Sequence, residues 1–541
     1  MANINSLPSS ILEKILKHTL DVYDLTSWSW QNQLRLLAVC RQWREIAQPH
    51  VHEMCFIKLR EEFGYDSDVS DSGTDIDDSY VLLDTNIDKV AANGLCHWAK
   101  HMHISLLWPS NPLAYINEVI SKLQTSNAQW SSVAKLTVWL TSSSSDLDTA
   151  ERLKSESLDN AVIKSAQVLL EQLPNVSRLN IRAYTMNGLA EIFVSQLAAH
   201  YAPQLRTLKC NIPLPLSPLH FSDTLAHLDL QLGPETGGLL SQVHAGSLQS
   251  IVLSNVPVDF AWRYFIGDAA DGKDNISFRQ LESMSLSYAG QLSRHRDVNA
   301  DDPYCLHFPK LKNISIQGCP ENCEILHAKT YLSKMNSISI TGSYSAIRAL
   351  AAMDIVSADS LFISMTSIGS QDLDDAFYET TNRLYGQALV SRWSKMVIPQ
   401  CNQSLDPRQI GWCNMTELVC HDCIEFNSLV ELIPRLPQAK KLSFAQITFE
   451  EDPLGIVEES VFAKQLVSPF DTCLKDMYLY INTEVYPAAL AAVKHLLVRI
   501  PSLSQVYLPH DMHLVMEKFV KRAQFEYRHL SKVKIEHAFS H

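Results

Sequence analysis

The sequence predicts an α/β protein in which a small N-terminal helical module precedes a long array of helix–strand units. A six-residue pattern, apolar-x-x-apolar-x-apolar, returns repeatedly from about residue 90 to the end of the chain. Segments with apolar residues at helical spacing come before many of its copies. At 541 residues, the chain is far longer than one compact domain of about 100–200 residues. An open-ended repeat array accounts for that length.

The N-terminal module is predicted from two apolar stripes within residues 7–49. Pro8 is placed near the first turn of a helix, where a missing N–H costs nothing. Ile11, Leu12 and Ile15 then recur at helical spacing. The second stripe consists of Leu34, Leu37, Cys40 and Trp43. A module this small cannot bury both stripes, so we expect exposed apolar surface that marks a partner site.

These two segments resemble the F-box, a helical module that docks on the adaptor subunit of a cullin–RING ubiquitin ligase. The resemblance implies that a Skp-type adaptor contacts the Leu-Pro pair, the aliphatic residues after it, and the Val-Cys-Arg-x-Trp segment. The corresponding residues are Leu7, Pro8, Ile11, Leu12, Ile15, Val39, Cys40 and Trp43. The family often has an acidic residue two positions after the proline, where this chain has Ser10. The alternative is a helical cap on the array, with all of these side chains in the core.

Residues 57–90 are predicted to form an acidic, disordered linker between the module (1–56) and the array (91–541). The stretch 65–79 is rich in Asp and Ser and cannot bury enough apolar surface to offset its ordering entropy. A solvated linker is therefore the favoured interpretation.

Two specific roles for this linker remain open. A calcium loop that starts at Asp68 has Gly73 at its sixth position, but Ser79 stands at the twelfth, where a bidentate Glu is needed. Acid-directed phosphorylation of Ser72 or Thr74 is the other, because an Asp lies three residues beyond each. The Asp-Ser-Gly at 71–73 is similar to a phospho-degron, although Ile76 replaces its second phosphorylatable residue.

The six-residue pattern occurs sixteen times, at intervals that average about 29 residues. Its copies start at Ala99, Val133, Val176, Leu205, Leu225, Leu248, Leu281, Leu311, Met335, Ala358, Trp393, Met415, Ala439, Leu474, Leu503 and Leu530. The last two apolar positions alternate with polar ones, as a half-buried strand requires.

Proline separates helix from strand in several of these units. Residues 161–173 and 488–500 are apolar at helical spacing, and Pro174 and Pro501 follow them directly. Proline ends a helix and favours an extended entry to the next strand. Helix, proline and short strand in repetition predict a curved solenoid with a parallel sheet inside and helices outside. This array resembles the leucine-rich repeats that some F-box proteins carry.

Composition argues against several classes of function. A net charge of −14 argues against non-specific nucleic-acid binding and against docking on an anionic membrane. The first residues do not look like a secretory signal, and no stretch approaches the ~18 apolar residues that span a bilayer. The twelve cysteines form no secreted framework, so we expect reduced thiols and a cytoplasmic or nuclear protein.

The sequence indicates a protein that is not an enzyme and that needs no cofactor. It contains no glycine-rich phosphate loop, no Gly-x-Ser-x-Gly elbow and no His-Glu-x-x-His metal motif. Cys420, His421 and Cys423 suggest a zinc site, but the repeat register favours a structural role. In a strand, Cys420 and His421 point to opposite faces, and Cys423 takes a position that such repeats turn inward. We therefore predict no catalytic residue and no metal site.

The polar positions of the strands are predicted to line the inner face of the solenoid. They include Arg178, Asn180 and Arg182 near the N-terminal end of the array. Three tyrosines near its C-terminal end, Tyr478, Tyr480 and Tyr507, are the predicted target-binding patch, because tyrosine buries much area with few rotors to freeze. The alternative is that a C-terminal helix or loop covers them.

Together these features predict the substrate-recognition subunit of a Skp–cullin–F-box ubiquitin ligase. The helical module would bind the adaptor, and through it a cullin, while the solenoid binds a protein target. A non-degradative interaction scaffold that uses the same surfaces is the alternative. The pattern does not identify the target.

Overall fold

A computed structural model describes most of the chain, with gaps. The described residues are 8–20, 31, 33–35, 37–63, 79–107, 112–125, 130–141, 156–183, 188–214, 219–233, 240, 243–257, 260, 262, 265, 275–289, 305–320, 323, 325, 335–352, 357–367, 374–386, 390–400, 405–449, 469–481 and 486–537. They fall into two compact units. Unit 1 comprises residues 1–255 and 263–270, and unit 2 comprises 256–262 and 271–541. The predicted α/β class is confirmed, since both units combine helices with a mostly parallel sheet.

Unit 1 has a parallel sheet with one antiparallel edge. Its strands are β1 (Met54–Phe63), β2 (Ser79–Thr85), β3 (His101–Leu107), β4 (Lys135–Thr141), β5 (Arg178–Ala183), β6 (Thr207–Pro213), β7 (His227–Gln231) and β8 (Ser250–Val256). Strand β2 pairs with β1 in the antiparallel sense, and β1 and β3–β8 then follow one another in parallel. The helices are α1 (Ser9–Leu20), α3 (Arg41–Val51), α4 (Ile87–Ala92), α5 (Leu113–Thr125), α6 (Glu156–Gln172) and α7 (Gly188–Tyr201).

Unit 2 has an all-parallel main sheet. Its strands are β10 (Ser283–Tyr288), β12 (Asn313–Cys319), β13 (Met335–Ser343), β14 (Ala358–Ser367), β15 (Val390–Ile398), β16 (Glu417–Glu425), β17 (Lys441–Thr448), β18 (Asp476–Ile481), β19 (Gln505–Leu508) and β20 (Lys534–His537). Two short strands, β9 (Asn275–Ser277) and β11 (Cys305–His307), form a separate pair. The helices are α10 (Tyr344–Ala352), α11 (Asp375–Gly386), α12 (Phe426–Leu432), α14 (Tyr486–Arg499) and α15 (His510–Ala523).

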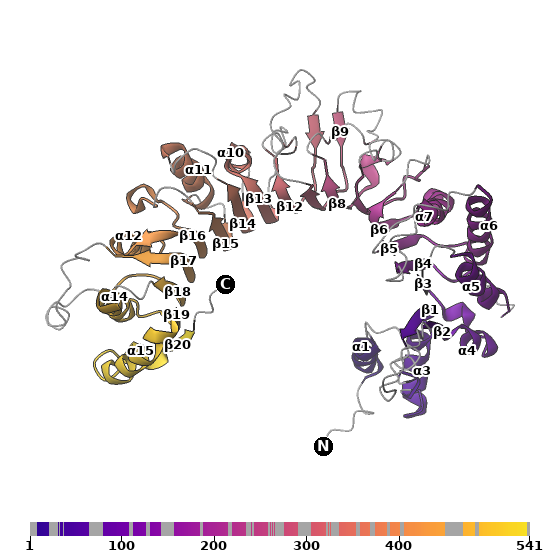
Figure 1. Ribbon diagram of the computed structural model, residues 1–541, viewed down its shortest axis with the longest axis horizontal. Coiled ribbons are helices and arrows are strands. Elements are labelled where there is room, and N and C mark those ends of the chain that lie inside the picture. Colours follow the sequence, from indigo (N-terminus) through magenta and orange to yellow (C-terminus); the bar gives the residue numbers. More distant parts are fainter. Residues whose placement is uncertain are drawn as a thin grey trace, which may run out of the picture. The chain divides into compact units, whose positions relative to one another are not determined.

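Within each unit, the helices after the N-terminal module lie on one side of the sheet (Figure 1). We call the opposite side the open face of that unit. The apolar positions of the pattern point toward the helices and form the core. Leu136, Leu179 and Leu208 are register partners on β4, β5 and β6, and each is fully buried. Alternate residues on the same strands therefore belong to the open face.

Each of the sixteen copies of the pattern overlaps a strand of these sheets. The register departs from the pattern at β15, where Leu361 of β14 pairs with Ser394. Trp393, expected at the first buried position, is 37% exposed instead. Ser394 takes the interior position because its hydroxyl donates to the Asn414 carbonyl and accepts from the Thr416 N–H. Two hydrogen bonds satisfy this buried polar side chain.

The predicted linker 57–90 differs from the structure at both of its ends. Residues 57–63 belong to β1 and residues 79–85 to β2, which pair along their length. The side chain of Asn86 is fully buried and joins the segments, since it accepts from the Phe56 N–H at 2.9 Å and donates to the Met54 carbonyl. The acidic composition of the middle concealed these flanking β-forming runs. Residues 64–78, with the calcium-loop and phosphorylation candidates except Ser79, lie outside the described residues.

Candidate functional site

The first candidate surface is the N-terminal pair of helices. Ile11 and Ile15 of α1 lie one helical turn apart and are 45% and 39% exposed. Val39, just before α3, is 53% exposed. Leu12 is fully buried. Glu13 of α1 and His50 of α3 approach to 3.5 Å, so the two helices are neighbours.

The remaining predicted adaptor contacts occupy varied positions in this module. Pro8 is exposed, and Cys40 and Trp43 are half-buried. Cys40 is the N-cap of α3, where its Sγ accepts a hydrogen bond from the Trp43 N–H at 3.5 Å. Leu7 lies outside the described residues. We call the exposed side chains of Ile11, Ile15 and Val39 the apolar ridge.

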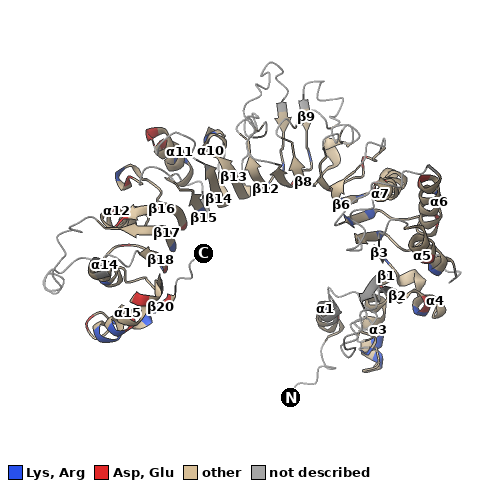
Figure 2. Cartoon of the chain, viewed as in Figure 1, with Lys and Arg blue, Asp and Glu red and all other residues tan. Residues whose placement is uncertain are grey.

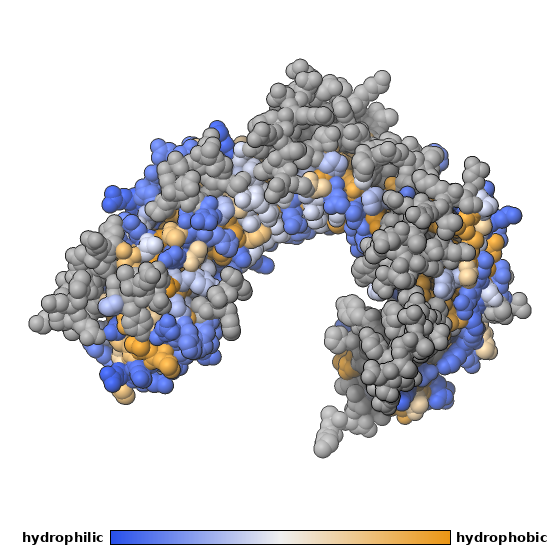
Figure 3. All heavy atoms as spheres, in the orientation of Figure 1, coloured by the Kyte–Doolittle hydropathy of each residue, from blue (hydrophilic) through white to orange (hydrophobic). Residues whose placement is uncertain are grey.

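A second set of exposed apolar side chains lies at α15 in unit 2. Leu514 and Val515 are 61% and 38% exposed. Figure 3 shows apolar surface in this part of unit 2. The periodicity argument did not single out these residues, because their helix also presents a buried apolar stripe that includes Met512 and Met516.

The predicted target patch lies on the open face of unit 2. Tyr478 and Tyr507 are register partners whose rings stack at 4.0 Å with an interplanar angle of 3°. The Lys441 ammonium lies 4.7 Å from the centre of the Tyr478 ring. Tyr480 is two residues further along β18, on the same face, and all three tyrosines are half-buried. The structure thus brings Tyr478 and Tyr507 into direct contact and leaves part of each side chain exposed.

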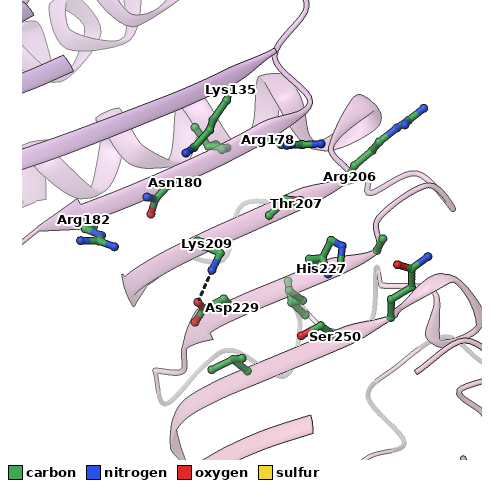
Figure 4. Close-up of a pocket in the computed structure, with 15 residues that line it drawn as sticks. Lys135, Arg178, Asn180, Arg182, Arg206, Thr207, Lys209, His227, Asp229 and Ser250 are labelled. Atoms are coloured by element: carbon green, nitrogen blue, oxygen red, sulfur yellow. Dashed lines mark ion pairs between the residues drawn. The ribbon is translucent and has the colours of Figure 1, made fainter. Parts of the chain in front are cut away.

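Several strands of the unit 1 sheet carry lysine or arginine residues (Figure 2). They line a hollow of about 760 Å³ over strands β4–β8 (Figure 4). We call this the cationic hollow; its cations are Lys135, Arg178, Arg182, Arg206 and Lys209. Only Lys209 among them has an ion pair within the described residues, to Asp229 at 3.5 Å. The alternation of residues along β5 predicted that Arg178 and Arg182 lie on one face of the sheet. It did not predict that Lys135 of β4 and Lys209 of β6 join them.

Two histidines, His101 and His103, stand beside these cations on β3. Both alternate with the buried Met102, yet His103 is itself 1% exposed and packs edge-on against Trp139. Burial, followed by repulsion from Lys58, Lys135 and Arg182, lowers the pKa of His103 to about 4. Burial and Lys135 lower the pKa of His101 to about 3. Both rings are therefore neutral near pH 7 and add no charge to the face.

The cysteine candidates do not assemble into a metal site. Among the residues that the structure describes, no three His, Cys, Asp or Glu side chains are grouped as a metal ion would require. Cys420 is buried, whereas His421 and Cys423 are exposed. The inward position expected for Cys423 is wrong, because a register shift in β16 between Cys420 and Cys423 turns it outward. Cys319, at the corresponding position of its repeat, is buried as expected.

Comparison with known proteins gives no family assignment. No protein-family model matches the sequence, and no curated protein matches it significantly. In the described part of the chain, no helix combines the length and the apolar character needed to cross a membrane.

Proposed function

We propose that this chain is the substrate-recognition subunit of a Skp–cullin–F-box type ubiquitin ligase. The helical module docks on a Skp-type adaptor and so reaches a cullin, while the open faces of the sheets hold a protein target. Ubiquitin transfer then gains from proximity, and the chemistry belongs to other subunits. This proposal uses no catalytic residue of this chain.

The apolar ridge is the observation that carries the proposal. Ile11, Ile15 and Val39 remain largely exposed although Leu12, Ala47 and Val51 of the same module are buried. Completing the burial of a half-exposed aliphatic side chain is worth about 1 kcal/mol. A partner that covers all three gains this free energy, and exposed apolar surface of this kind is typical of interfaces.

The target-binding side is proposed to include the tyrosine pair of unit 2. Stacked tyrosines lose little conformational entropy on binding, because each ring already holds the other in place. Lys441 adds a donor beside the Tyr478 ring. These features suit a protein surface with both apolar and polar groups. Tyr480 extends the patch along β18.

The first prediction concerns the adaptor. The variant Ile11→Asp/Ile15→Asp/Val39→Asp should bind a purified Skp-type adaptor at least about 100-fold more weakly, since interface anchors contribute 1–2 kcal/mol each or more. Its thermal midpoint should stay near the wild-type value, because the three positions are exposed. Titration of the adaptor against the immobilised protein measures the affinity.

The matched control is Leu514→Asp/Val515→Asp, which introduces the same chemistry at exposed apolar positions of α15. It should leave adaptor binding unchanged. Equal adaptor affinity for the wild type and the ridge variant would refute the proposal. Recovery of adaptor without cullin in a pull-down would also contradict it and would favour the non-degradative scaffold.

A further inference from the structure

Within the described residues, carboxylates neutralise the positive charge of the cationic hollow only in part. Of its five cations, only Lys209 has an ion pair with another described residue, Asp229. Among the described residues, Lys135, Arg178 and Arg206 have no carboxylate within ion-pair distance, and Arg182 lies 5.6 Å from the centre of the Trp139 ring instead. This concentration occurs in a chain whose net charge is −14. It is therefore a local feature and not a consequence of a basic composition.

The cations also lie close enough to repel one another. Lys135 on β4 and Arg178 on β5 are register partners. Lys209 lies on the next strand, β6, where its register partner on β5 is Asn180. Burial, followed by repulsion from Arg178, Lys209 and Arg182, lowers the pKa of Lys135, and the Glu53 carboxylate opposes this shift only in part. Like charges on neighbouring strands destabilise a sheet. Anionic groups bound in the hollow would reverse this unfavourable interaction.

The spread of the cations indicates the form of the ligand. Arg178 and Arg182 are four residues apart on β5, a distance of about 13 Å at about 3.3 Å per residue. Strands β4 and β6 lie on either side of β5, so the cations extend about 10 Å across the sheet. A single phosphate group holds its oxygens within a few ångströms and reaches only part of this area. An extended peptide, whose alternate side chains lie about 7 Å apart, distributes anionic groups over all of it.

The lining favours a peptide over a nucleic acid. Single-stranded nucleic acids bind on aromatic platforms that stack their bases. Among the described residues that line the hollow there is no Phe, Tyr or Trp, and His227 is the one aromatic side chain. A chain of net charge −14 also repels a long polyanion, whereas a short acidic segment meets mainly the local field.

We infer that the cationic hollow of unit 1 binds a short, extended acidic segment of a polypeptide, with its carboxylate or phosphate groups on Arg178, Arg182, Arg206, Lys135 and Lys209. This inference rests on the proposed function in one respect, namely that the segment belongs to the ligase target. The side chains of Asn180, Thr207 and Ser250 supply further polar groups in the hollow. Arginine forks suit planar carboxylates as well as phosphates.

Fluorescence anisotropy of a labelled peptide tests the inference. The probe is an eight-residue peptide of alternating Asp and Glu, and its isosteric Asn and Gln version is the neutral control. The full-length protein should bind the acidic peptide at least about tenfold more tightly than the neutral one, with an affinity that falls as salt rises. Arg178→Ala/Lys209→Ala should weaken binding at least tenfold. Asp229→Asn removes the carboxylate that lines the described part of the hollow and should strengthen binding about twofold or more.

Further arms distinguish the ligand chemistries. A matched control, Lys440→Ala/Lys475→Ala, removes the same charge from exposed positions of unit 2 and should leave peptide binding unchanged. If a peptide with two phosphoserines binds more tightly than the Asp/Glu peptide, the natural anions are phosphates. If the two peptides bind equally, the natural anions are carboxylates. Both results support the inference. Tighter binding of a single-stranded RNA oligonucleotide, equal binding of the neutral peptide, or indifference to Arg178→Ala/Lys209→Ala would overturn it.

The adaptor proposal and the peptide proposal can be tested independently of each other. The ridge variant Ile11→Asp/Ile15→Asp/Val39→Asp should retain full peptide affinity, and Arg178→Ala/Lys209→Ala should retain full adaptor affinity. Loss of peptide binding alone would remove the ligand assignment and leave the adaptor proposal intact. Loss of adaptor binding alone would do the opposite.

Discussion

The open faces of the two units use one kind of strand for different surfaces. On unit 1, Lys135 and Arg178 are register partners of the same sign. On unit 2, the equivalent row runs Lys395, Glu417, Lys441 and Asp476, so that charge alternates from strand to strand. Opposite charges on adjacent strands stabilise a sheet, and like charges destabilise it. This row of unit 2 therefore places opposite charges side by side, whereas the Lys135–Arg178 pair of unit 1 does not.

This difference teaches that fold and binding chemistry occupy separate positions of the same strand. The buried positions are mostly apolar in both units, as Leu179 of β5 and Leu442 of β17 illustrate, with Ser394 as a polar exception. The alternate positions lie on the side of the sheet opposite the helices (Figure 1), so most of them can vary without loss of the core. The proposed binding groups therefore belong to the open positions.

The largest expected effect tests the shared interior. Leu179→Ala in unit 1 and Leu442→Ala in unit 2 should each lower the free energy of unfolding by about 2–5 kcal/mol, because both side chains are fully buried. Neighbouring open-face changes, Asn180→Ala and Ser443→Ala, should stay within about 0.5 kcal/mol. Urea titration followed by circular dichroism measures these values. Comparable losses at the buried and open positions would contradict the separation of roles.

The next effect tests the burial of two histidines beside the cations of unit 1. The folded-state pKa values of His101 and His103, about 3 and about 4, lie below the unfolded value of about 6.5. As pH falls below 6.5, the unfolded state takes up protons that the folded state does not, so stability falls. The expected loss between pH 7 and pH 5 is up to roughly 2 kcal/mol for each histidine.

The double variant His101→Gln/His103→Gln should flatten this pH dependence. Urea titrations at pH 7 and pH 5 check the result. His495→Gln in unit 2 should remove a similar share of the pH dependence, because burial and Arg499 lower the pKa of His495 to about 4. A pH dependence that the His101→Gln/His103→Gln variant leaves intact would show that these rings titrate normally.

The smallest effect concerns the tyrosine pair of unit 2. A double-mutant cycle with Tyr478→Ala and Tyr507→Ala should give a coupling free energy of about 0.5–1.5 kcal/mol, as expected for stacked rings. Thermal unfolding of the four proteins supplies the values. Additive losses would indicate that the rings do not interact in solution and would weaken the tyrosine patch as a preformed surface.

Much of the strand arrangement was predictable because the buried side of each strand carries a local signal. The spacing of Leu136 and Val138 recurs in the other copies of the six-residue pattern, and a strand overlaps each copy. Strands β1 and β2 were missed because the intervening acidic stretch dominated the composition of their region. The register change at Trp393 was missed because Ser394 replaces an apolar residue in the interior.

For the candidate sites, the sequence predicted the face of the sheet on which single residues lie. It did not predict which residues of different strands come together. Spacing alone put Arg178 and Arg182 on the inner face, and it put Tyr478 and Tyr507 on the same face of their strands. The cationic hollow emerges only when strands that start 20–43 residues apart in sequence are aligned in register. Burial of His103 against Trp139 likewise depends on a neighbouring strand. Such contacts between repeats have no signature within one repeat.

Isothermal titration of the full-length protein with a purified Skp-type adaptor tests the central proposal most directly. We predict one adaptor per chain, with a negative heat-capacity change from burial of the apolar ridge. That change should shrink in Ile11→Asp/Ile15→Asp/Val39→Asp together with the affinity. No detectable binding by the wild-type protein, or binding whose heat-capacity change is the same in the variant, would contradict the assignment of this ridge to an adaptor.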